Sequence, residues 1–363
     1  MQYLWLVVFL LLPVAALAYC GWHIWQLLPL GAWWRSAVIA AGVVSFALLF
    51  AAVGPAVDRM PMALATWVYN IGCSSLIVLL YLFMLFLLTD LLTLTHILPR
   101  TFIHHSWTGT LTLLAVMLAV FTYGYLNYIH KVRVPLTYHS DGRLPHSYRL
   151  VMVSDLHLGY HNRRAELARW IDLINAEHPA ALLIAGDIVD RSVRPLNEED
   201  MAAEWQRLEC PVYACLGNHE YYSGEPESEQ FYRRAGITLL RDSSVVIDSC
   251  ITVIGRDDRT NMRRNSVKQL MSGVNRGTFT ILLDHQPYHL EEAEQQGVDL
   301  QFSGHTHYGQ VWPASWITDA LYECAFGPHR RGNTHYYVSS GLGIWGGKFR
   351  IGTRSEYTVV TID

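Results

Sequence analysis

The first 130 residues of this chain carry almost no charge, and that feature limits what they can fold into more than any other. The charged side chains in this segment are Arg35, Asp58, Arg59, Asp90 and Arg100. The other 24 basic and 29 acidic residues all lie from Lys131 onward, where the net charge is about −5. This division predicts a membrane segment followed by an ordinary globular segment.

Four apolar stretches in the first segment have the roughly 20 residues that a helix needs to cross a bilayer. They are Leu4–Leu28, Ala32–Val53, Leu64–Leu88 and Trp107–Tyr128. Proline and glycine fall between them, where turns belong, and tryptophans gather near their ends, as in interfacial belts. A cleaved signal peptide is disfavoured because no positive charge precedes the first stretch and the apolar run continues past Ala18. We therefore predict a transmembrane anchor of about four helices over residues 1–130.

An even number of spans would place the N-terminus and the globular segment on the same side of the membrane. That side would carry Arg59, Lys131, Arg133 and Arg143, and the opposite side Arg35 and Arg100. The positive-inside rule then favours a cytoplasmic globular segment. Asp90 and the histidines that follow it are interpreted as interfacial loop residues, with an intramembrane site as the alternative.

Charge and cysteine usage exclude two classes of protein. The globular segment has no basic surplus, so nucleic acid is not an expected partner. The six cysteines are scattered, and Cys210 and Cys215 would point to opposite faces of one strand, which makes them poor disulfide partners. Single buried thiols in a reducing compartment are expected.

Beyond a polar linker at residues 131–147, short β-branched runs alternate with helical stretches. The predicted strands are Arg149–Ser154, Ala180–Ala185, Val212–Leu216, Phe279–Leu283 and Leu300–Phe302, and predicted helices include Arg163–Glu177 and Glu198–Leu208. Polar residues follow the carboxyl end of each strand. The pattern predicts an α/β architecture with a site along one edge of the sheet.

Each of these five strands is followed by a short segment, and all five segments contain residues of types that bind divalent metals. They are Asp155-Leu156-His157, Gly186-Asp187-Ile188-Val189-Asp190, Gly217-Asn218-His219-Glu220, Asp284-His285 and Gly304-His305-Thr306-His307. Carboxylate, imidazole and amide oxygen are ligands of borderline-hard divalent ions. One such piece alone is typical of an ordinary loop. Five in order indicate a metal site, because so many buried ionisable groups would otherwise stay uncompensated.

The order D-x-H, G-D-x-x-D, G-N-H-E, a single H and G-H-x-H resembles the signature of the calcineurin-like metallophosphoesterases. The resemblance covers residues 148–363, about 60% of the chain, and all five pieces are intact. It implies a catalytic domain folded as a four-layer α-β-β-α sandwich, with a loop-built site for two divalent metal ions. Mn, Fe and Zn all suit such mixed ligands, so the metal identity is left open.

The resemblance also implies a role for each site residue. The first metal would be bound by Asp155, His157 and His307, the second by Asn218, His285 and His305, and both by Asp187. His219 does not fit the family's ligand pattern and would act as general acid, while Asp190 would hydrogen-bond His219 and fix its tautomer. The alternative for Asp190 is a helix cap. Arg191 is either a phosphate clamp or a surface residue.

The C-terminal part resembles a membrane-associated bacterial subgroup of this family and its animal transmembrane relatives. The resemblance rests on Gly309-Gln310, Ser339–Gly343 and Arg350-Ile351-Gly352. Tyr308 stands where that subgroup often has Gly or Asn, a change that spares the metal ligands and alters the pocket entrance. The resemblance implies an integral protein of a bacterial inner membrane.

Together these features predict hydrolysis of a phosphodiester or pyrophosphate bond by metal-activated hydroxide, without a protein nucleophile. The anchor favours a lipid-linked substrate similar to UDP-diacylglucosamine, which a related family of pyrophosphatases cleaves. The apolar stretch Trp312–Phe326 would be an acyl-chain lid or, equally, a core-packing helix. A phosphatase or phosphodiesterase for soluble substrates is the alternative, and a degenerate sensor is disfavoured because no ligand is missing. Oligomeric state is left open.

Overall fold

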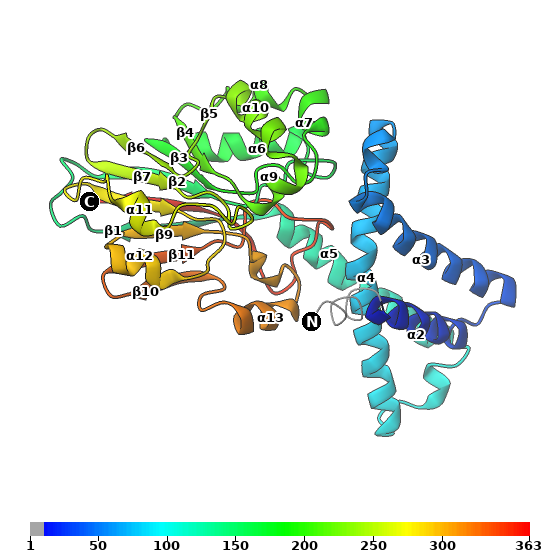
Figure 1. Cartoon of the computed structure of the whole chain (residues 1–363). Coiled ribbons are helices and arrows are strands. Elements are labelled where there is room, and N and C mark those ends of the chain that lie inside the picture. Colours follow the sequence, from blue (N-terminus) through cyan, green and yellow to red (C-terminus); the bar gives the residue numbers. More distant parts are fainter. Residues whose placement is uncertain (1–10) are drawn as a thin grey trace. The chain divides into compact units, whose positions relative to one another are not determined.

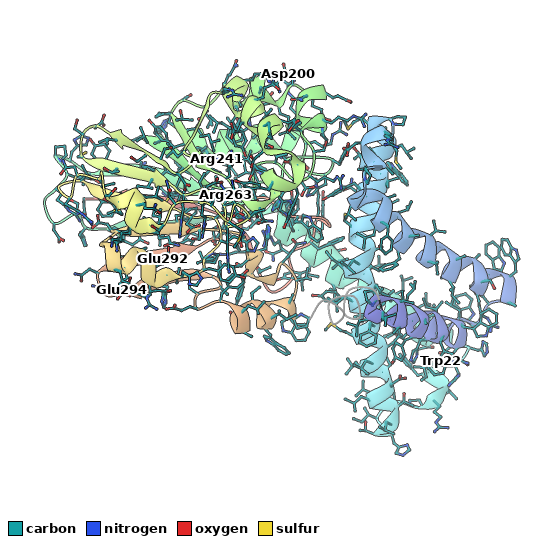
Figure 2. All side chains as sticks on the ribbon, in the orientation of Figure 1. Trp22, Asp200, Arg241, Arg263, Glu292 and Glu294 are labelled. Carbon is teal, nitrogen blue, oxygen red and sulfur yellow. The ribbon has the colours of Figure 1, made fainter. Side chains whose placement is uncertain are left out.

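The computed structural model describes residues 11–363, and within it the chain divides into two compact units (Figure 1). The helical unit contains residues up to Tyr125 together with Gly346–Lys348. The sheet unit contains Leu126–Trp345 and Phe349–Asp363. Figure 2 shows the contrast in side-chain chemistry between them: charged residues such as Arg241 and Glu292 are labelled in the sheet unit, and Trp22 in the helical unit.

Long apolar helices make up the membrane segment. They are α2 (Leu12–Leu27), α3 (Ala32–Val53), α4 (Met62–Leu94) and α5 (Trp107–Ile129), with short turns η2 (Val57–Arg59) and η3 (Arg100–Phe102) between them. Helices α3, α4 and α5 are long and apolar enough to cross a membrane, so three of the predicted stretches form apolar helices of the required length. The count of four is not confirmed, because the first predicted stretch begins outside the described residues and α2 has 16 residues.

Asp90 differs from its interpretation as an interfacial loop residue. It lies inside α4, where its carboxylate accepts a hydrogen bond from the Tyr19 hydroxyl at 2.6 Å and lies 3.0 Å from Nε2 of His23. Both partners belong to α2. A carboxylate among apolar helices needs such polar partners, which explains why it is paired within the helix bundle rather than left in a loop.

Two six-stranded sheets form the centre of the sheet unit. The first sheet has the strand order β1 (Lys131–Tyr138), β12 (Ser355–Ile362), β2 (Tyr148–Val153), β3 (Ala181–Ala185), β4 (Val212–Cys215) and β5 (Ile237–Leu239). The second has β10 (Gly327–Arg331), β11 (Thr334–Val338), β9 (Leu300–Ser303), β8 (Phe279–Leu283), β7 (Ile251–Gly255) and β6 (Ser243–Ile247). Strands β2 to β5 run parallel, as do β7, β8, β9 and β11, so their carboxyl ends share one edge of each sheet.

Apolar side chains join the sheets to each other and to the helices outside them. The helices are α6 (Arg164–Asn175), α7 (Arg194–Glu198), α8 (Met201–Trp205), α9 (Asn218–Ser223), α10 (Glu225–Ala235), α11 (Val267–Met271), α12 (Leu290–Gln296) and α13 (Ala314–Leu321), with the turn η4 (His307–Gly309). Met152, Ile281 and Phe302 belong to the core between the sheets. Trp170 and Phe231 join α6 and α10 to the first sheet, and α11 and α12 cover the second. This arrangement confirms the α-β-β-α prediction.

Residues 131–147 are not simply the predicted linker. Their first half is strand β1, which pairs in parallel with β12 from Lys131 opposite Ser355 to Tyr138 opposite Ile362. Since the partner lies more than 200 residues away in the sequence, no local pattern indicated the pairing. Pro135 is tolerated because β1 is an edge strand.

The predicted helix Glu198–Leu208 is also divided. It is replaced by α7 and α8, with Asp200 between them in a left-handed conformation with φ of 50°. Asp200 is labelled in Figure 2 at this break.

Candidate metal centre

The predicted site residues all follow the carboxyl ends of five parallel strands. Asp155 and His157 follow β2, Asp187 and Asp190 follow β3, Asn218 and His219 follow β4, His285 follows β8, and His305 and His307 follow β9. The structure places their donor atoms in three overlapping groups: Asp155, His157 and His307; His157, Asp187 and His219; and Asp187, His285 and His305. Parallel strands deliver polar loops to a common edge, so residues far apart in sequence converge.

One group of donors surrounds the space between two facing imidazoles. Nε2 of His157 lies 3.0 Å from Nε2 of His307. Oδ1 of Asp155 lies 3.5 Å from the His307 nitrogen and 3.9 Å from the His157 nitrogen. Asp155 and His157 have no exposed surface. Two ring nitrogens and a carboxylate that converge in this way are a suitable donor set for a divalent ion.

A second group lies beside the first. Nε2 of His285 lies 3.1 Å from Oδ1 of Asn218, which in turn lies 2.8 Å from Nδ1 of His305. Oδ2 of Asp187 lies 3.2 Å from Nε2 of His285 and 3.7 Å from Nε2 of His157. Asp187 therefore faces both groups, which is the position that a bridging carboxylate needs.

The backbone around these donors is strained. Asp155, Asp187 and His305 have left-handed φ values of 55°, 55° and 71°. Such conformations cost of the order of 1–3 kcal/mol each and persist where the surrounding structure enforces them, often at functional sites.

Glycines in the motifs make room for the two aspartates. A Cβ atom on Gly217 would lie 2.1 Å from Oδ1 of Asp187, and one on Gly304 would lie 2.2 Å from Oδ2 of Asp155. Only glycine fits against carboxylates at those distances, which explains the glycine in the G-N-H-E and G-H-x-H motifs. The donor chemistry and this shaped cradle fit divalent metal binding.

Electrostatics hold three of the donors in the protonation states that metal binding requires. Burial, and next the neighbouring His285, lower the pKa of His305 to about 4, so its imidazole is neutral at pH 7. Burial and His157 hold the pKa of His307 well below its usual range. Burial alone would raise the pKa of Asp187, but His285 and His219 hold it well below its usual range. Neutral imidazoles and an ionised carboxylate are the forms that bind metals. In His285, burial lowers the pKa, but the neighbouring Asp187 outweighs it and raises this pKa well above its usual range.

His219 is fixed by backbone hydrogen bonds at the rim of the site. Its Nδ1 donates to the carbonyl oxygen of Asp190 at 2.5 Å, and its backbone N–H donates to Oδ1 of Asp187 at 2.9 Å. The side chain keeps 15% of its surface exposed. Since Nδ1 is engaged with a carbonyl, Nε2 is the nitrogen left to face a substrate.

The carboxylate of Asp190 lies closer to His157 than to His219, its predicted partner. Its Oδ1 lies 3.3 Å from Nδ1 of His157 but 3.6 Å from Nδ1 of His219. The carbonyl of Asp190 thus holds the ring of His219, and its carboxylate faces His157. Burial raises the pKa of Asp190, but the bond with His157 outweighs it and the result is about 2. Asp190 does not cap a helix, because α7 begins at Arg194 with Val193 as its N-cap.

Arg191 directly follows Asp190, and its side chain is partly exposed. Nothing in the site's geometry tests a contact with phosphate, so its role as a clamp stays a prediction.

Two buried residues support the site, and sequence reasoning assigned them no role. The Glu220 carboxylate accepts hydrogen bonds from the backbone N–H groups of Gly217, Asp187 and Val189 at 2.7, 3.1 and 3.0 Å, and from the Tyr232 hydroxyl at 2.7 Å. Arg350 donates to the carbonyl oxygens of His307 and Gly343, both at 2.9 Å. The sequence features that could have pointed to them are the glutamate that ends the G-N-H-E motif and an arginine within a glycine-rich C-terminal segment.

Aromatic side chains flank the donors. The ring of Tyr322 lies 6.3 Å from that of His305, and its hydroxyl lies 3.1 Å from that of Tyr288. The guanidinium of Arg259 lies 4.1 Å above the Tyr288 ring. Tyr308 stacks on Phe326 with a centroid separation of 4.9 Å.

The chain is similar in sequence to known proteins. The family described as calcineurin-like phosphoesterase matches residues 148–309. A transmembrane protein with metallophosphoesterase domain from Danio rerio is 29% identical over 276 residues, which cover 71% of this chain and 63% of the relative. An uncharacterized metallophosphoesterase from Aquifex aeolicus is 31% identical over 223 residues, which cover 59% of this chain and 84% of the relative.

Other relatives are matched over a smaller part of their length. An uncharacterized metallophosphoesterase from Campylobacter jejuni is 28% identical over 59% of this chain and 59% of its own, so the chain spans about three fifths of this relative and of the Danio rerio one. Among solved structures, a 5'-nucleotidase precursor from Thermus thermophilus has a TM-score of 0.36 at 16% identity, over 60% of this chain and 54% of its own.

The family match extends across all five motifs that supply the donor groups. The Aquifex relative is matched over most of its length. The donor geometry and the sequence relatives agree, and the chain belongs to the calcineurin-like phosphoesterase family, whose members are metal-dependent hydrolases.

Proposed function

We propose that this chain is a membrane-anchored phosphoesterase with a binuclear metal centre, and that it hydrolyses a phosphodiester or pyrophosphate bond in a lipid-linked substrate. The observation that carries the proposal is the pair of donor groups that share Asp187. Its Oδ2 atom lies within 4 Å of the imidazoles of both His157 and His285. A carboxylate shared in this way is typical of two-metal hydrolases.

Two sets of ligands would each hold one ion. Asp155, His157 and His307 would bind the first, Asn218, His285 and His305 the second, and Asp187 both. Mn, Fe and Zn suit this mixture of carboxylate, imidazole and amide ligands. Bound divalent ions supply charge stabilisation for a phosphate group and a water that is nucleophilic at neutral pH.

His219 would donate a proton to the leaving oxygen. The hydrogen bond from Nδ1 to the Asp190 carbonyl fixes the ring and leaves Nε2 as the nitrogen that can reach the leaving group. A protonated imidazole held in this way can act as general acid. Asp190 would be a positioning residue that orients both His219 and His157, through its carbonyl and its carboxylate respectively.

The membrane segment supports a lipid-linked substrate. Helix α5 ends at Ile129 and strand β1 begins at Lys131, so one residue separates a membrane-spanning helix from the sheet that carries the site. A substrate confined to the bilayer would reach such a site at high effective concentration. A UDP-diacylglucosamine-like molecule is one candidate, and soluble phosphate esters are the alternative.

The substrate classes are separated by comparing two turnovers in one preparation. Purified full-length protein is assayed on a soluble chromogenic phosphodiester and on a detergent-dispersed lipid pyrophosphate, with the Asp187→Ala variant as the control for contaminating activity. We expect a higher kcat/KM for the lipid pyrophosphate. Equal values for both substrates would contradict the lipid assignment, and no turnover of either would contradict the phosphoesterase itself.

A further inference from the structure

We infer that α13 is a membrane-surface element, whose exposed apolar face lies in the interfacial layer of the bilayer that holds the helical unit. The partner is the lipid surface itself. The inference goes beyond the proposed function, because it holds for any substrate of the site.

The first observation is an unusual concentration of exposed apolar side chains. From Lys131 to Asp363, all of which is described, nine large apolar residues are well exposed: Leu173, Tyr222, Val246, Met262, Trp312, Trp316, Ile317, Leu321 and Trp345. Four of the nine fall within the ten residues that contain α13, and Trp316, Ile317 and Leu321 are each more than 60% exposed. Scattered exposed residues are normal, but a cluster of this kind marks an interaction surface.

The two faces of α13 differ in chemistry. Its buried residue is Ser315, and Asp319 accepts a hydrogen bond from the hydroxyl of Tyr308, next to the ligand His307. The one buried residue of α13 is therefore polar, and its large apolar residues Trp316, Ile317 and Leu321 are exposed. A core-packing helix has the opposite arrangement, so that interpretation does not describe α13, although Cys324 and Ala325 at the end of the stretch are buried.

The second observation is a set of hydrogen bonds within the sheet unit that ties α13 to the end of a membrane span. Asn127, in the last turn of α5, donates to the carbonyl oxygens of Arg350 and Thr353 at 2.9 and 2.7 Å. The backbone N–H of Trp312 donates to the carbonyl of Ile351, in the same segment, at 2.7 Å. The start of α13 and the exit of the span are thus fixed to one stretch of four residues.

A bilayer surface fits this face better than other partners do. Tryptophan prefers the interfacial layer, and Trp312 and Trp316 pack edge to face with their centroids 5.3 Å apart. Eight residues extend for about 12 Å, which is too short to cross a membrane but sufficient to lie in its surface. The chain already anchors itself in a bilayer, so no further component is needed to bring the partner within reach.

The same contacts connect the membrane surface to the metal centre. Arg350 donates a hydrogen bond to the carbonyl of His307. Tyr308, the next residue, donates a hydrogen bond from its hydroxyl to Asp319 of α13. An α13 held in the headgroup layer would therefore keep the G-H-x-H loop at that depth. The site would be presented to groups at the membrane surface.

The test measures depth directly and does not depend on turnover. Full-length protein with Cys210→Ser, which removes the least buried thiol, receives a nitroxide at Ile317→Cys, or in a second variant at Leu321→Cys, and is placed in lipid nanodiscs. The matched control is Met262→Cys, at an exposed apolar residue far from α13 in the sequence. Collision rates with oxygen, which partitions into lipid, and with a neutral nickel chelate, which stays in water, are compared.

We expect the ratio of oxygen to nickel accessibility to be severalfold higher at positions 317 and 321 than at 262. An equal ratio at all three positions would place α13 in water and overturn the inference. Protection from both reagents would show that protein covers the helix, for example a second copy of the chain, and would overturn it as well. Failure of the phosphoesterase proposal would leave these ratios unchanged.

Discussion

At the scale of single residues, Asp187 has the most demanding position in the site, because one carboxylate faces both donor groups. We predict that Asp187→Ala lowers the metal content of the purified protein from about two ions per chain to near zero, since neither ion keeps a full set of ligands. Elemental analysis by mass spectrometry measures this content. Asp172→Ala, at an exposed aspartate of α6, is the matched control and should keep both ions. Retention of one ion by Asp187→Ala would show that this carboxylate does not bridge.

His219 should behave in the opposite way. We predict that His219→Ala lowers kcat by roughly 10²–10⁴-fold, the usual contribution of a general acid, and leaves the metal content unchanged. Turnover and elemental analysis on the same preparation separate the two effects. The backbone N–H of residue 219, which bonds Asp187, is preserved in the variant. Loss of an ion would mean that His219 is a ligand.

Arg350 is a buried cation that holds the G-H-x-H loop through carbonyl oxygens. We predict that Arg350→Lys lowers the free energy of unfolding by about 1–3 kcal/mol, because an ammonium cannot reproduce the planar fork and at least one buried carbonyl loses its donor. Chemical denaturation of the detergent-solubilised protein measures the change. The exposed Arg330→Lys is the control and should be neutral. A neutral Arg350→Lys would show that the loop is held by its other contacts.

The types and order of the ligands could be predicted from the sequence, because each follows directly on an apolar strand. The contacts by which more distant residues support these ligands could not be predicted from the sequence. The partner of the Asp190 carboxylate depends on which way a side chain turns within a loop, and this is decided by the neighbouring loop that carries His157. The tie between Arg350 and His307 joins residues 43 positions apart, and no local pattern encodes it.

At the scale of elements, the five site strands were predicted to within one residue, because buried parallel strands are continuous apolar runs. The other strands were not predicted, among them the interior strands β7, β11 and β12 and the edge strands. In β1 and β6, exposed residues interrupt the apolar ones, and their signal resembles that of a loop. Antiparallel edge strands such as β10 are short and rich in charge, which protects an edge but hides the strand in the sequence.

Glu220 joins two of these elements. Its carboxylate caps the start of α9 and accepts hydrogen bonds from backbone N–H groups of the loop that follows β3. We predict that Glu220→Gln lowers the free energy of unfolding by about 1–3 kcal/mol, because the amide nitrogen replaces one acceptor and leaves a buried N–H without a partner. Denaturant titration measures this loss.

Glu198→Gln, at an exposed position on α7, is the control for the loss of one negative charge. Equal stability of the two variants would show that the loops do not depend on Glu220.

At the scale of the whole molecule, the distribution of charge along the sequence predicted the division into a membrane segment and a globular segment. The number of spans was harder to predict. Helices α3, α4 and α5 qualify by length and composition, whereas α2 as described has 16 residues, or about 24 Å, against a hydrocarbon core of about 30 Å. The apolar sequence that precedes α2 extends to Leu4, which is the basis for a fourth span.

An even or odd number of spans decides whether the N-terminus and the metal centre lie on the same side of the membrane. Four spans place both chain ends on one side, and the positive-inside rule then makes that side cytoplasmic, with Arg59 and Lys131 next to it. We predict that epitope tags at the N-terminus and the C-terminus are both protected from protease in intact spheroplasts and both cleaved after permeabilisation.

The control for protease access is a tag inserted at Gly31, between α2 and α3, which should be cleaved without permeabilisation. An N-terminal tag cleaved in intact spheroplasts would reduce the count to three, and a cleaved C-terminal tag would place the metal centre outside the cytoplasm. In the latter case a substrate made in the cytoplasm would have to cross the bilayer before it reached the site, so this experiment also limits which lipid-linked molecules the enzyme meets.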